Sequence, residues 1–209
     1  VHASGPGLKV SPQFVAPDRI AYMTKTRTSG TLTFTSGEAG SPQDLVNPSW
    51  SQEGAQVVYH AGQLETMHHY SNSPGTELLG VVDDPDFELV HASGWPAVSP
   101  DGSTLVVSER TPSGDRMALV LWNADGTNPR RVYRDDVTVM GLEWSRDGRW
   151  LVFGAGSFFE RRTIEPSQIM IMRPDGSDAH AVTKGSANAG FPSWSPDGTQ
   201  IVYRLWTDN

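Results

Sequence analysis

Arginine side chains recur at similar points along this chain, each a few residues after a short β-branched or aromatic run. Arg110 follows Leu-Val-Val, Arg161 and Arg162 follow Leu-Val-Phe, and Arg204 follows Ile-Val-Tyr. The planar guanidinium fork suits bidentate binding of a carboxylate or phosphate. The sequence therefore predicts a set of ligand-binding cations, to which two N-terminal residues in the same kind of loop are added: Arg110, Arg161, Arg162, Arg204, Lys25 and Arg27.

Histidine and tyrosine side chains gather in the same class of loop. His60 directly follows the run Val-Val-Tyr, His68, His69 and Tyr70 lie further along that loop, and His91 begins the connector into the next unit. A histidine near its ordinary pKa suits a general base, and a tyrosine hydroxyl can donate the proton. These five residues are therefore the candidate catalytic set. A solvated loop is the alternative interpretation.

The cation set also has a plain alternative, because Arg110 and Arg161 stand beside Glu109 and Glu160. Such surface ion pairs contribute only about 0–1 kcal/mol and need no ligand. His68 and His69 have no carboxylate next to them in sequence, so we predict no metal site and no cofactor.

A repeat of the chain positions these candidates. Units anchored at Trp50, Val98, Trp144 and Trp194 are spaced by 48, 46 and 50 residues, and a degraded first copy begins near Phe14. Most anchors precede a Ser-x-x-Gly or Ser-Pro-Asp-Gly turn and then a short β-branched run. Periods of this length indicate repeat architectures.

Each unit is typical of strands rather than helices. Pro-Asp-Gly between two β-branched runs is a tight-turn signal, and Asp125-Gly126 and Asp175-Gly176 indicate a second hairpin in their units. The unit is therefore a four-stranded antiparallel meander, and radial repetition of such sheets makes a β-propeller. In this interpretation Asp101, Asp147 and Asp197 build turns, and the anchor tryptophans pack between blades.

The predicted fold is an all-β propeller with four complete blades and a partial fifth. The predicted blades span residues 12–47, 48–94, 95–141, 142–190 and 191–209 of a single domain. We expect the chain to be a fragment of a larger propeller, whose remaining blades come from the parent chain or a second chain. The alternative is a small five-bladed ring that Leu8–Ser11 closes at the fifth blade.

The blade order separates the two rims of the propeller. The Pro-Asp-Gly turns share one rim, and the loops between second and third strands share the other. Those loops, at 23–30, 59–76, 107–116, 153–168 and 203–209, hold seven basic and six acidic residues in a chain of net charge −8. Binding residues favour long loops on a rigid scaffold. The rim that carries these loops, here called the loop rim, is therefore the predicted binding face.

Composition excludes several classes of function. A net charge of −8 and a pI near 5.1 disfavour nucleic acid as a partner. No apolar run approaches the roughly 18 residues of a membrane-spanning helix. The chain has no cysteine, which excludes disulfides and thiolate metal sites. It also contains no Gly-x-Ser-x-Gly, His-Glu-x-x-His or phosphate-loop motif, so hydrolases and nucleotide enzymes of those types are disfavoured.

The segment from Trp194 to Tyr203, with the Pro-Asp-Gly-Ser string ending at Ser177, resembles the TolB-type, WD40-like (PD40-type) propeller repeat. Val98 departs from this pattern, as do Gln52 and Glu53 of the second unit. The family includes scaffolds, gating domains of peptidases and polysaccharide lyases. The resemblance thus implies a propeller that binds an acidic small molecule, glycan or partner protein. Its alternative is a lyase that cleaves a uronate-containing glycan by His/Tyr acid–base β-elimination.

Overall fold

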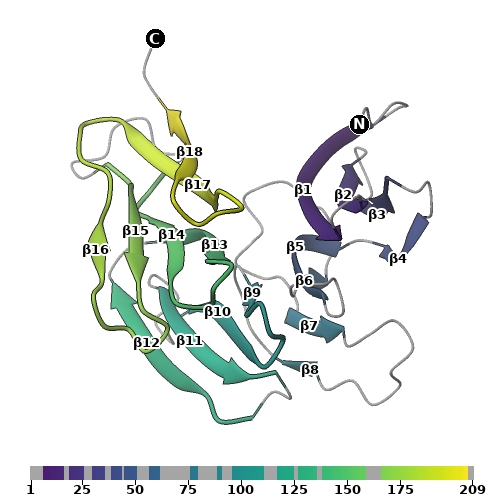
Figure 1. The fold of residues 1–209 in the computed structure, drawn as a ribbon, viewed down its shortest axis with the longest axis horizontal. Coiled ribbons are helices and arrows are strands. Elements are labelled where there is room, and N and C mark those ends of the chain that lie inside the picture. Colours follow the sequence, from purple (N-terminus) through teal and green to yellow (C-terminus); the bar gives the residue numbers. More distant parts are fainter. Residues whose placement is uncertain are drawn as a thin grey trace.

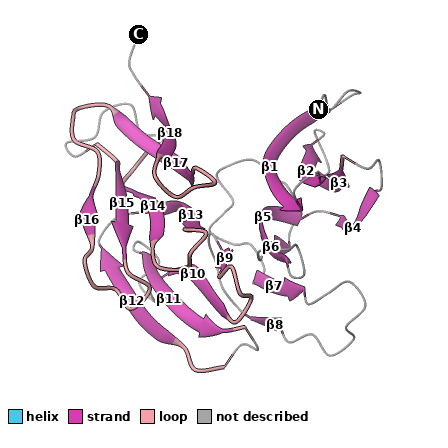
Figure 2. Ribbon diagram, in the orientation of Figure 1, coloured by secondary structure: helices cyan, strands magenta, loops and turns pink. Residues whose placement is uncertain are grey.

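The computed structural model describes thirteen stretches of the chain. They are residues 7–16, 19–25, 30–35, 39–43, 45–50, 57–61, 76–79, 89–90, 96–110, 117–124, 127–135, 138–158 and 166–206. Every regular element in these stretches is a β-strand (Figure 2). They contain no helix of the length and apolarity that a membrane span requires.

The strands form four four-stranded sheets and one two-stranded sheet, in chain order. The first sheet has β1 (Leu8–Ala16), β2 (Arg19–Lys25), β3 (Gly30–Phe34) and β4 (Ala39–Gln43). The second has β5 (Leu45–Trp50), β6 (Val57–Ala61), β7 (Thr76–Leu79) and β8 (Leu89–Val90). The third has β9 (Pro96–Val98), β10 (Thr104–Arg110), β11 (Met117–Asn123) and β12 (Arg130–Asp135). The fourth has β13 (Val139–Trp144), β14 (Leu151–Ala155), β15 (Gln168–Met172) and β16 (His180–Ala181), and the fifth has β17 (Asn188–Trp194) and β18 (Ile201–Trp206).

The five sheets follow one another along an arc, with β1 at one end and β17 and β18 at the other (Figure 1). All pairings between strands are antiparallel, as the hairpin pattern predicts. The all-β propeller with four complete blades and a partial fifth is therefore confirmed. The alternative closure by Leu8–Ser11 is wrong. These residues lie in β1, whose Leu8 and Val10 pair with Lys25 and Met23 of the first sheet.

Successive residues of each second strand face opposite neighbours, because side chains alternate across a sheet. Val106 of β10 packs in a cluster with Leu142, Leu151 and other residues of the fourth sheet, while Val107 packs with Val98 and Leu105 of its own. Both valines are 0% exposed. In the same way Val152 of β14 packs with Ala189 of the fifth sheet. The second strands of the third and fourth sheets therefore each share one face with the following blade.

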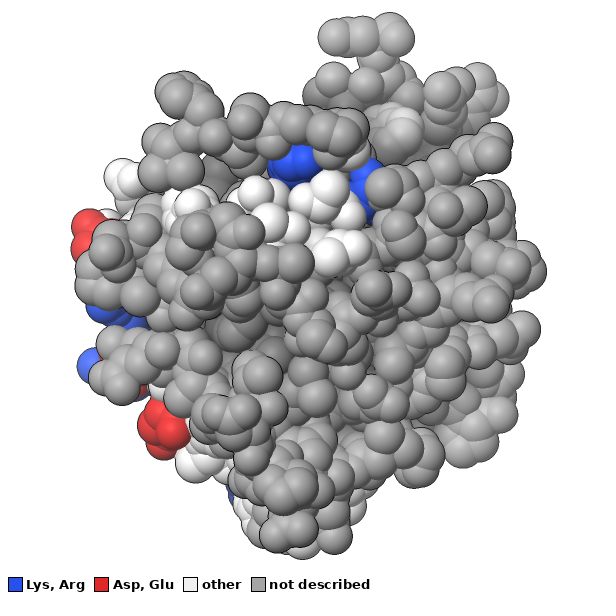
Figure 3. Space-filling model, turned by 90° about the vertical axis from the view of Figure 1, so that its right-hand side faces the viewer, with Lys and Arg blue, Asp and Glu red and all other residues white. Residues whose placement is uncertain are grey.

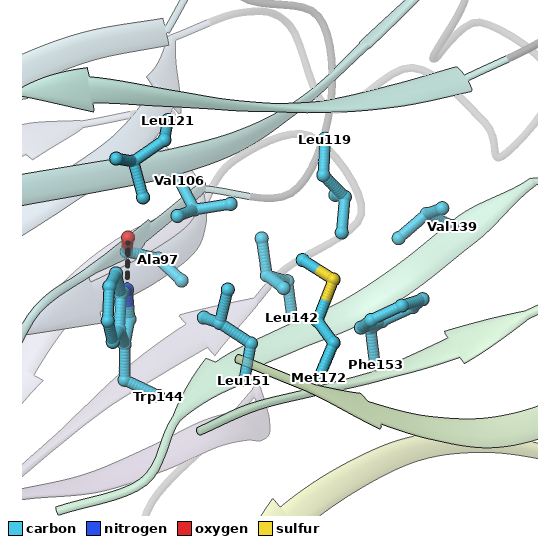
Figure 4. Packing of buried hydrophobic residues seen from close by; sticks show 10 residues of the cluster. All are labelled: Ala97, Val106, Leu119, Leu121, Val139, Leu142, Trp144, Leu151, Phe153 and Met172. Carbon is cyan, nitrogen blue, oxygen red and sulfur yellow. Dashed lines mark hydrogen bonds between the residues drawn. The ribbon is translucent and has the colours of Figure 1, made fainter. Parts of the chain in front are cut away.

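The anchor tryptophan of the fourth blade reaches back to the third. Trp144 is 9% exposed and lies in the cluster that joins the third and fourth sheets (Figure 4). Its indole Nε1 donates a 2.9 Å hydrogen bond to the carbonyl oxygen of Ala97. The bond satisfies a buried polar atom that would otherwise be costly. Trp144 therefore wedges two blades together, as predicted for the anchor tryptophans.

The repeated turn is held by its own aspartate. The Asp101 carboxylate accepts hydrogen bonds from the Ser99 hydroxyl at 2.6 Å and from the Ser103 backbone N–H at 3.0 Å. Gly102 follows at φ 73°, a conformation that glycine adopts without strain. These hydrogen bonds lower the pKa of Asp101, and the Ser195 and Thr199 bonds lower the pKa of Asp197 to about 2. The Asp residues of the repeat are therefore occupied by the turn.

Replacing Asp101 by alanine is expected to lower the free energy of unfolding by about 1 kcal/mol, a net hydrogen-bond contribution discounted for exposure. In a chain of this size that is a fall of roughly 2–4 °C in Tm, measured by circular dichroism. Asp101→Asn keeps an acceptor for the Ser103 N–H and should lose less. A Tm unchanged by Asp101→Ala would contradict the structural role.

The first strand of a sheet carries a β-bulge that the repeat pattern does not reveal. It lies between Met140 and Glu143 in β13 and between Gly190 and Ser193 in β17. The first strands of the second, fourth and fifth sheets accordingly begin at 45, 139 and 188, three residues before the blade boundaries predicted from the anchors. The extra residue of the bulge breaks the alternation of side chains. The strand therefore begins before the regularly alternating segment that the sequence pattern reveals.

Side chains next to the anchors bridge neighbouring blades. The Ser49 hydroxyl accepts a 3.2 Å hydrogen bond from the Val98 N–H, and the Glu143 carboxylate accepts one of 3.3 Å from the Trp194 N–H. Ser49 and Glu143 each precede their own anchor by one residue, and each binds the anchor of the next blade. The same position of the repeat therefore forms an interblade contact twice.

Candidate functional site

The structure describes only part of the candidate set. Lys25 ends β2, His60 lies in β6, Arg110 ends β10 and Arg204 lies within β18. The other candidates lie outside the described residues: Arg27, His68, His69, Tyr70, His91, Arg161 and Arg162. The convergence of the whole set on one mouth therefore stays a prediction.

The strand register shows which described candidates occupy equivalent positions in different blades. The residues opposite the four anchors are Val57, Leu105, Leu151 and Ile201. Three positions after them come His60, Ser108, Gly154 and Arg204. Arg110 comes five positions after Leu105, the place that Trp206 takes in the fifth blade. Arg204 therefore shares its blade position with His60, and Arg110 lies two residues nearer the loop rim in its strand.

The third and fourth sheets are complete, and the burial of the residue at this shared position is described in both. In each of them the residue lies between blades. Ser108 is 0% exposed, and Gly154 is buried, since a Cβ added to it would lie 3.4 Å from the Cα of Gly190 in the fifth sheet. Arg204 is exposed. Ala189, next to its strand partner Gly190, packs on Val152, so Gly190 and Arg204 point away from the fourth blade. Arg204 therefore faces the side of the fifth sheet on which a following blade would pack.

Aromatic rings hold the Arg204 guanidinium at the loop-rim end of this sheet. Its Cζ lies 5.4 Å from the ring centroid of Phe191 and 5.9 Å from that of Phe158. Phe158 in turn makes edge-to-face contacts with Phe191 at 5.3 Å and with Trp206 at 5.9 Å. We call Phe158, Phe191, Trp206 and Arg204 the aromatic–arginine cluster. Cation–π contact of this kind fixes a guanidinium while its N–H groups still reach solvent.

Phe158 fits at this position because a neighbouring glycine leaves room for its ring and hydrogen bonds fix its backbone. It is 1% exposed, and a Cβ on Gly190 would lie 2.5 Å from its ring, so only glycine leaves room. The Asn188 amide donates a 3.3 Å hydrogen bond to the Phe158 carbonyl and accepts one of 3.0 Å from the Ser167 N–H. The loop after β14 is thereby fastened to the first residue of β17.

Phe191 has an uncommon backbone conformation. Its φ is 54°, in the left-handed region that a bulky residue adopts only at a cost of order 1–3 kcal/mol. The corresponding residue of the fourth blade is Gly141, at φ 62°. Strain of this kind is common at binding sites. Here it places the Phe191 ring against Phe158 and Arg204.

Sequence reasoning identified part of the cluster. Arg204 was a candidate ligand-binding residue, whereas Phe191, Gly190 and Asn188 were missed. The usable signal was Trp206, which is off the register of the anchor tryptophans. Phe158 followed by Phe159 in a polar loop was a second signal.

The charges around the cluster favour an anion. Among the described residues no carboxylate pairs with Arg204, whereas Arg173 pairs with Asp178 at 3.3 Å. Figure 3 views the side of the molecule on which the first two sheets lie, and shows basic side chains beside uncharged atoms in its upper part and both acidic and basic atoms along its left edge. The described part of the chain brings no three His, Asp or Glu together as metal ligands. A bidentate contact to a carboxylate or phosphate is the chemistry that Arg204 offers.

Comparison with known proteins places the fold. No protein-family model matches the sequence. The chain is 25% identical over 188 residues to an uncharacterised peptidase, YuxL, of Bacillus subtilis, and the match covers 87% of this chain and 24% of that protein. The chain thus spans about a quarter of this relative's length.

Two solved structures resemble it in shape. TolB from Acinetobacter baumannii matches with a TM-score of 0.65 and 16% identity, over 90% of this chain and 49% of that one. An oligogalacturonate lyase in complex with manganese matches with a TM-score of 0.57 and 10% identity, over 90% of this chain and 56% of that one. At such identity the likeness concerns fold alone. The five antiparallel sheets and these likenesses give the chain a TolB-like β-propeller fold.

Proposed function

We propose that this chain is a binding propeller that recognises an acidic group of a small molecule, glycan or partner protein on its loop rim. One observation carries the proposal. Arg204 is an exposed cation with its guanidinium over two aromatic rings, and no described carboxylate pairs with it. A fixed guanidinium loses less conformational entropy on binding than a mobile one.

Arg204→Gln is the direct test, because glutamine keeps much of the length and loses the charge. Hydrogen bonds to charged groups contribute about 1.5–3 kcal/mol, so the variant should bind an acidic ligand roughly 10- to 100-fold more weakly. Calorimetric titration with galacturonate oligomers and with glutamate-rich peptides measures the change. Neutral glucose oligomers test the charge requirement.

Arg146→Gln is the matched control, since Arg146 is an exposed arginine in the repeated turn on the opposite rim. It removes the same charge from the chain and should leave affinity unchanged. Equal weakening by both substitutions would reduce the effect to net charge. Equal binding of acidic and neutral ligands would overturn the proposal.

The lyase alternative has one observation in its favour, the shared blade position of His60 and Arg204. It requires a base near a bound uronate, and the rest of its histidine and tyrosine set lies outside the described residues. Oligogalacturonate incubated with the protein would then yield an unsaturated product that absorbs in the ultraviolet. Binding of the oligomer without that absorbance would support the binding propeller and contradict the lyase alternative.

A further inference from the structure

The residue before each anchor lies where one blade contacts the next, a contact here called a joint. This position holds Ser49 in the second blade, Ala97 in the third and Glu143 in the fourth. Of these three residues, Glu143 alone has a side chain that ionises near neutral pH. The joint between the fourth and fifth blades therefore has a titratable group at a position where the two preceding joints have an uncharged residue.

The strands around Glu143 offer it no partner of opposite charge. β13 and β17, the neighbouring β14 and the inner strand β9 of the third sheet contain no other Asp, Glu, His, Lys or Arg. The charged residues of adjoining elements lie elsewhere: Glu109 and Arg110 at the loop-rim end of β10, Arg146 and Asp147 in the exposed turn after β13, and Arg204 towards the loop-rim end of β18. A carboxylate closed into this joint would therefore be unpaired.

Two uncharged groups of β17 face the carboxyl of Glu143 instead. It accepts a 3.3 Å hydrogen bond from the Trp194 N–H, and it also forms a hydrogen bond with the Ser193 side chain. The two strands are close beside this contact, because a Cβ on Gly141 would lie 2.9 Å from the Cα of Phe191. A neutral carboxyl can both accept and donate hydrogen bonds in such a place, whereas an unpaired charge removed from water is far more costly. The closed joint therefore favours protonated Glu143.

The joint between the third and fourth blades has a hydrogen bond that the next joint does not repeat. The Trp144 indole donates to the carbonyl oxygen of Ala97 at 2.9 Å. The equivalent indole N–H of Trp194 is buried and has no acceptor among the described residues. At the anchor end of β17, the contact with the fourth blade therefore depends on the carboxyl of Glu143.

We infer that the joint between the fourth and fifth blades is a proton-sensitive contact, closed while Glu143 is uncharged and opened locally when Glu143 releases its proton to water. Opening separates the anchor end of β17 from β13, so that water reaches the carboxylate. The joint between the third and fourth blades, which an indole hydrogen bond and an apolar cluster hold, stays closed. Folded proteins open locally in this way at a lower free energy than global unfolding requires.

Linkage gives the direction and the pH range of this opening. Burial in the closed joint raises the pKa of Glu143 from 4.5 to about 7, although its two hydrogen bonds act in the opposite direction. Opening is therefore least favourable below pH 4.5, becomes roughly tenfold more favourable for each pH unit up to about 7, and levels off above that. Between pH 5 and pH 8 the population of the open joint should rise roughly 10- to 100-fold.

Hydrogen exchange of the full chain, followed by NMR, compares two amides at equivalent joints. The Trp194 N–H binds Glu143, and the Val98 N–H binds the uncharged Ser49 hydroxyl at 3.2 Å. Protection factors, which correct for the intrinsic dependence of exchange on pH, are measured from pH 5 to pH 8. We expect the protection of the Trp194 amide to fall roughly 10- to 100-fold over this range, and that of the Val98 amide to stay constant.

Two substitutions of Glu143 supply the controls. Glu143→Gln should make the protection of the Trp194 amide independent of pH. Glu143→Ser, which places the residue of the second blade at this joint, should do the same if the glutamine variant does not fold. Protection of Trp194 that stays constant or rises with pH in the parent would overturn the inference, because the carboxylate would then be charged in the closed joint. An equal loss at Trp194 and Val98 would also overturn it, since global unfolding would then account for both.

Discussion

Replacing Trp144 by alanine should lower the free energy of unfolding by about 3–5 kcal/mol, among the largest effects of any single change in this chain. The indole is 9% exposed and lies in the cluster with Ala97, Val106 and Leu151 that joins the third and fourth blades. Its removal leaves a cavity between two sheets and strips the Ala97 carbonyl of its 2.9 Å hydrogen bond. Urea unfolding followed by circular dichroism measures the loss.

A pair of phenylalanine substitutions separates packing from hydrogen bonding. Trp144→Phe keeps most of the aromatic packing and loses the hydrogen bond to Ala97. It should therefore lower the free energy of unfolding by about 1–3 kcal/mol more than the loss of packing alone would. Trp194→Phe removes a buried indole N–H that has no hydrogen-bond partner among the described residues, so it should cost less than Trp144→Phe. Equal losses at both positions would contradict a specific role for the Trp144 bond.

The sequence predicted the blades well because their signals are local. A turn held by Asp101, or by Asp147 with its 2.6 Å bond from Ser145, depends on residues within five positions of one another. Strand alternation is equally local, and in the structure Val106 and Val107 lie on opposite faces of β10. The repeat then placed the blades in order without any knowledge of contacts between sheets.

The bulges and the aromatic–arginine cluster were not predictable in this way. Phe191 adopts a left-handed conformation at a position where the fourth blade has Gly141, and no sequence rule assigns that conformation to phenylalanine. Phe158 contacts it only because a loop of the fourth blade crosses onto the fifth, where Gly190 leaves space. Arg204 was recognised as a cation, but its supports depend on packing between blades that a local pattern does not encode.

The interblade carboxylate of Glu143 was missed for the same reason, and it has a measurable consequence. Glu143 accepts hydrogen bonds from the Trp194 N–H and the Ser193 side chain, which favour its charged form. Burial between the blades outweighs them and raises the pKa of Glu143 from 4.5 to about 7. The folded protein therefore holds a proton on Glu143 that the unfolded chain releases at lower pH.

The sign of the resulting pH dependence follows from linkage. A carboxyl with a raised folded-state pKa contributes its full stability below pH 4.5 and loses it as pH rises through about 7. The turn residues Asp101, Asp147 and Asp197 have lowered pKa values, so their contributions change only below about pH 4. The two effects therefore occupy separate pH ranges.

Glu143→Gln should remove this dependence. Glutamine keeps an oxygen for the Trp194 N–H and never ionises, so the variant should gain stability over the parent between pH 4.5 and 8, by at most about 3 kcal/mol. Urea unfolding of both proteins at pH 5 and pH 8 gives the difference, which cancels contributions from other titrating groups. Glu143→Ala, which removes the acceptor, should be less stable than Glu143→Gln at both values. A parent-to-Gln difference that stays constant across this range would show that Glu143 is charged in the folded protein, and the contact with Trp194 would then be a charge-assisted hydrogen bond that Glu143→Gln weakens at every pH.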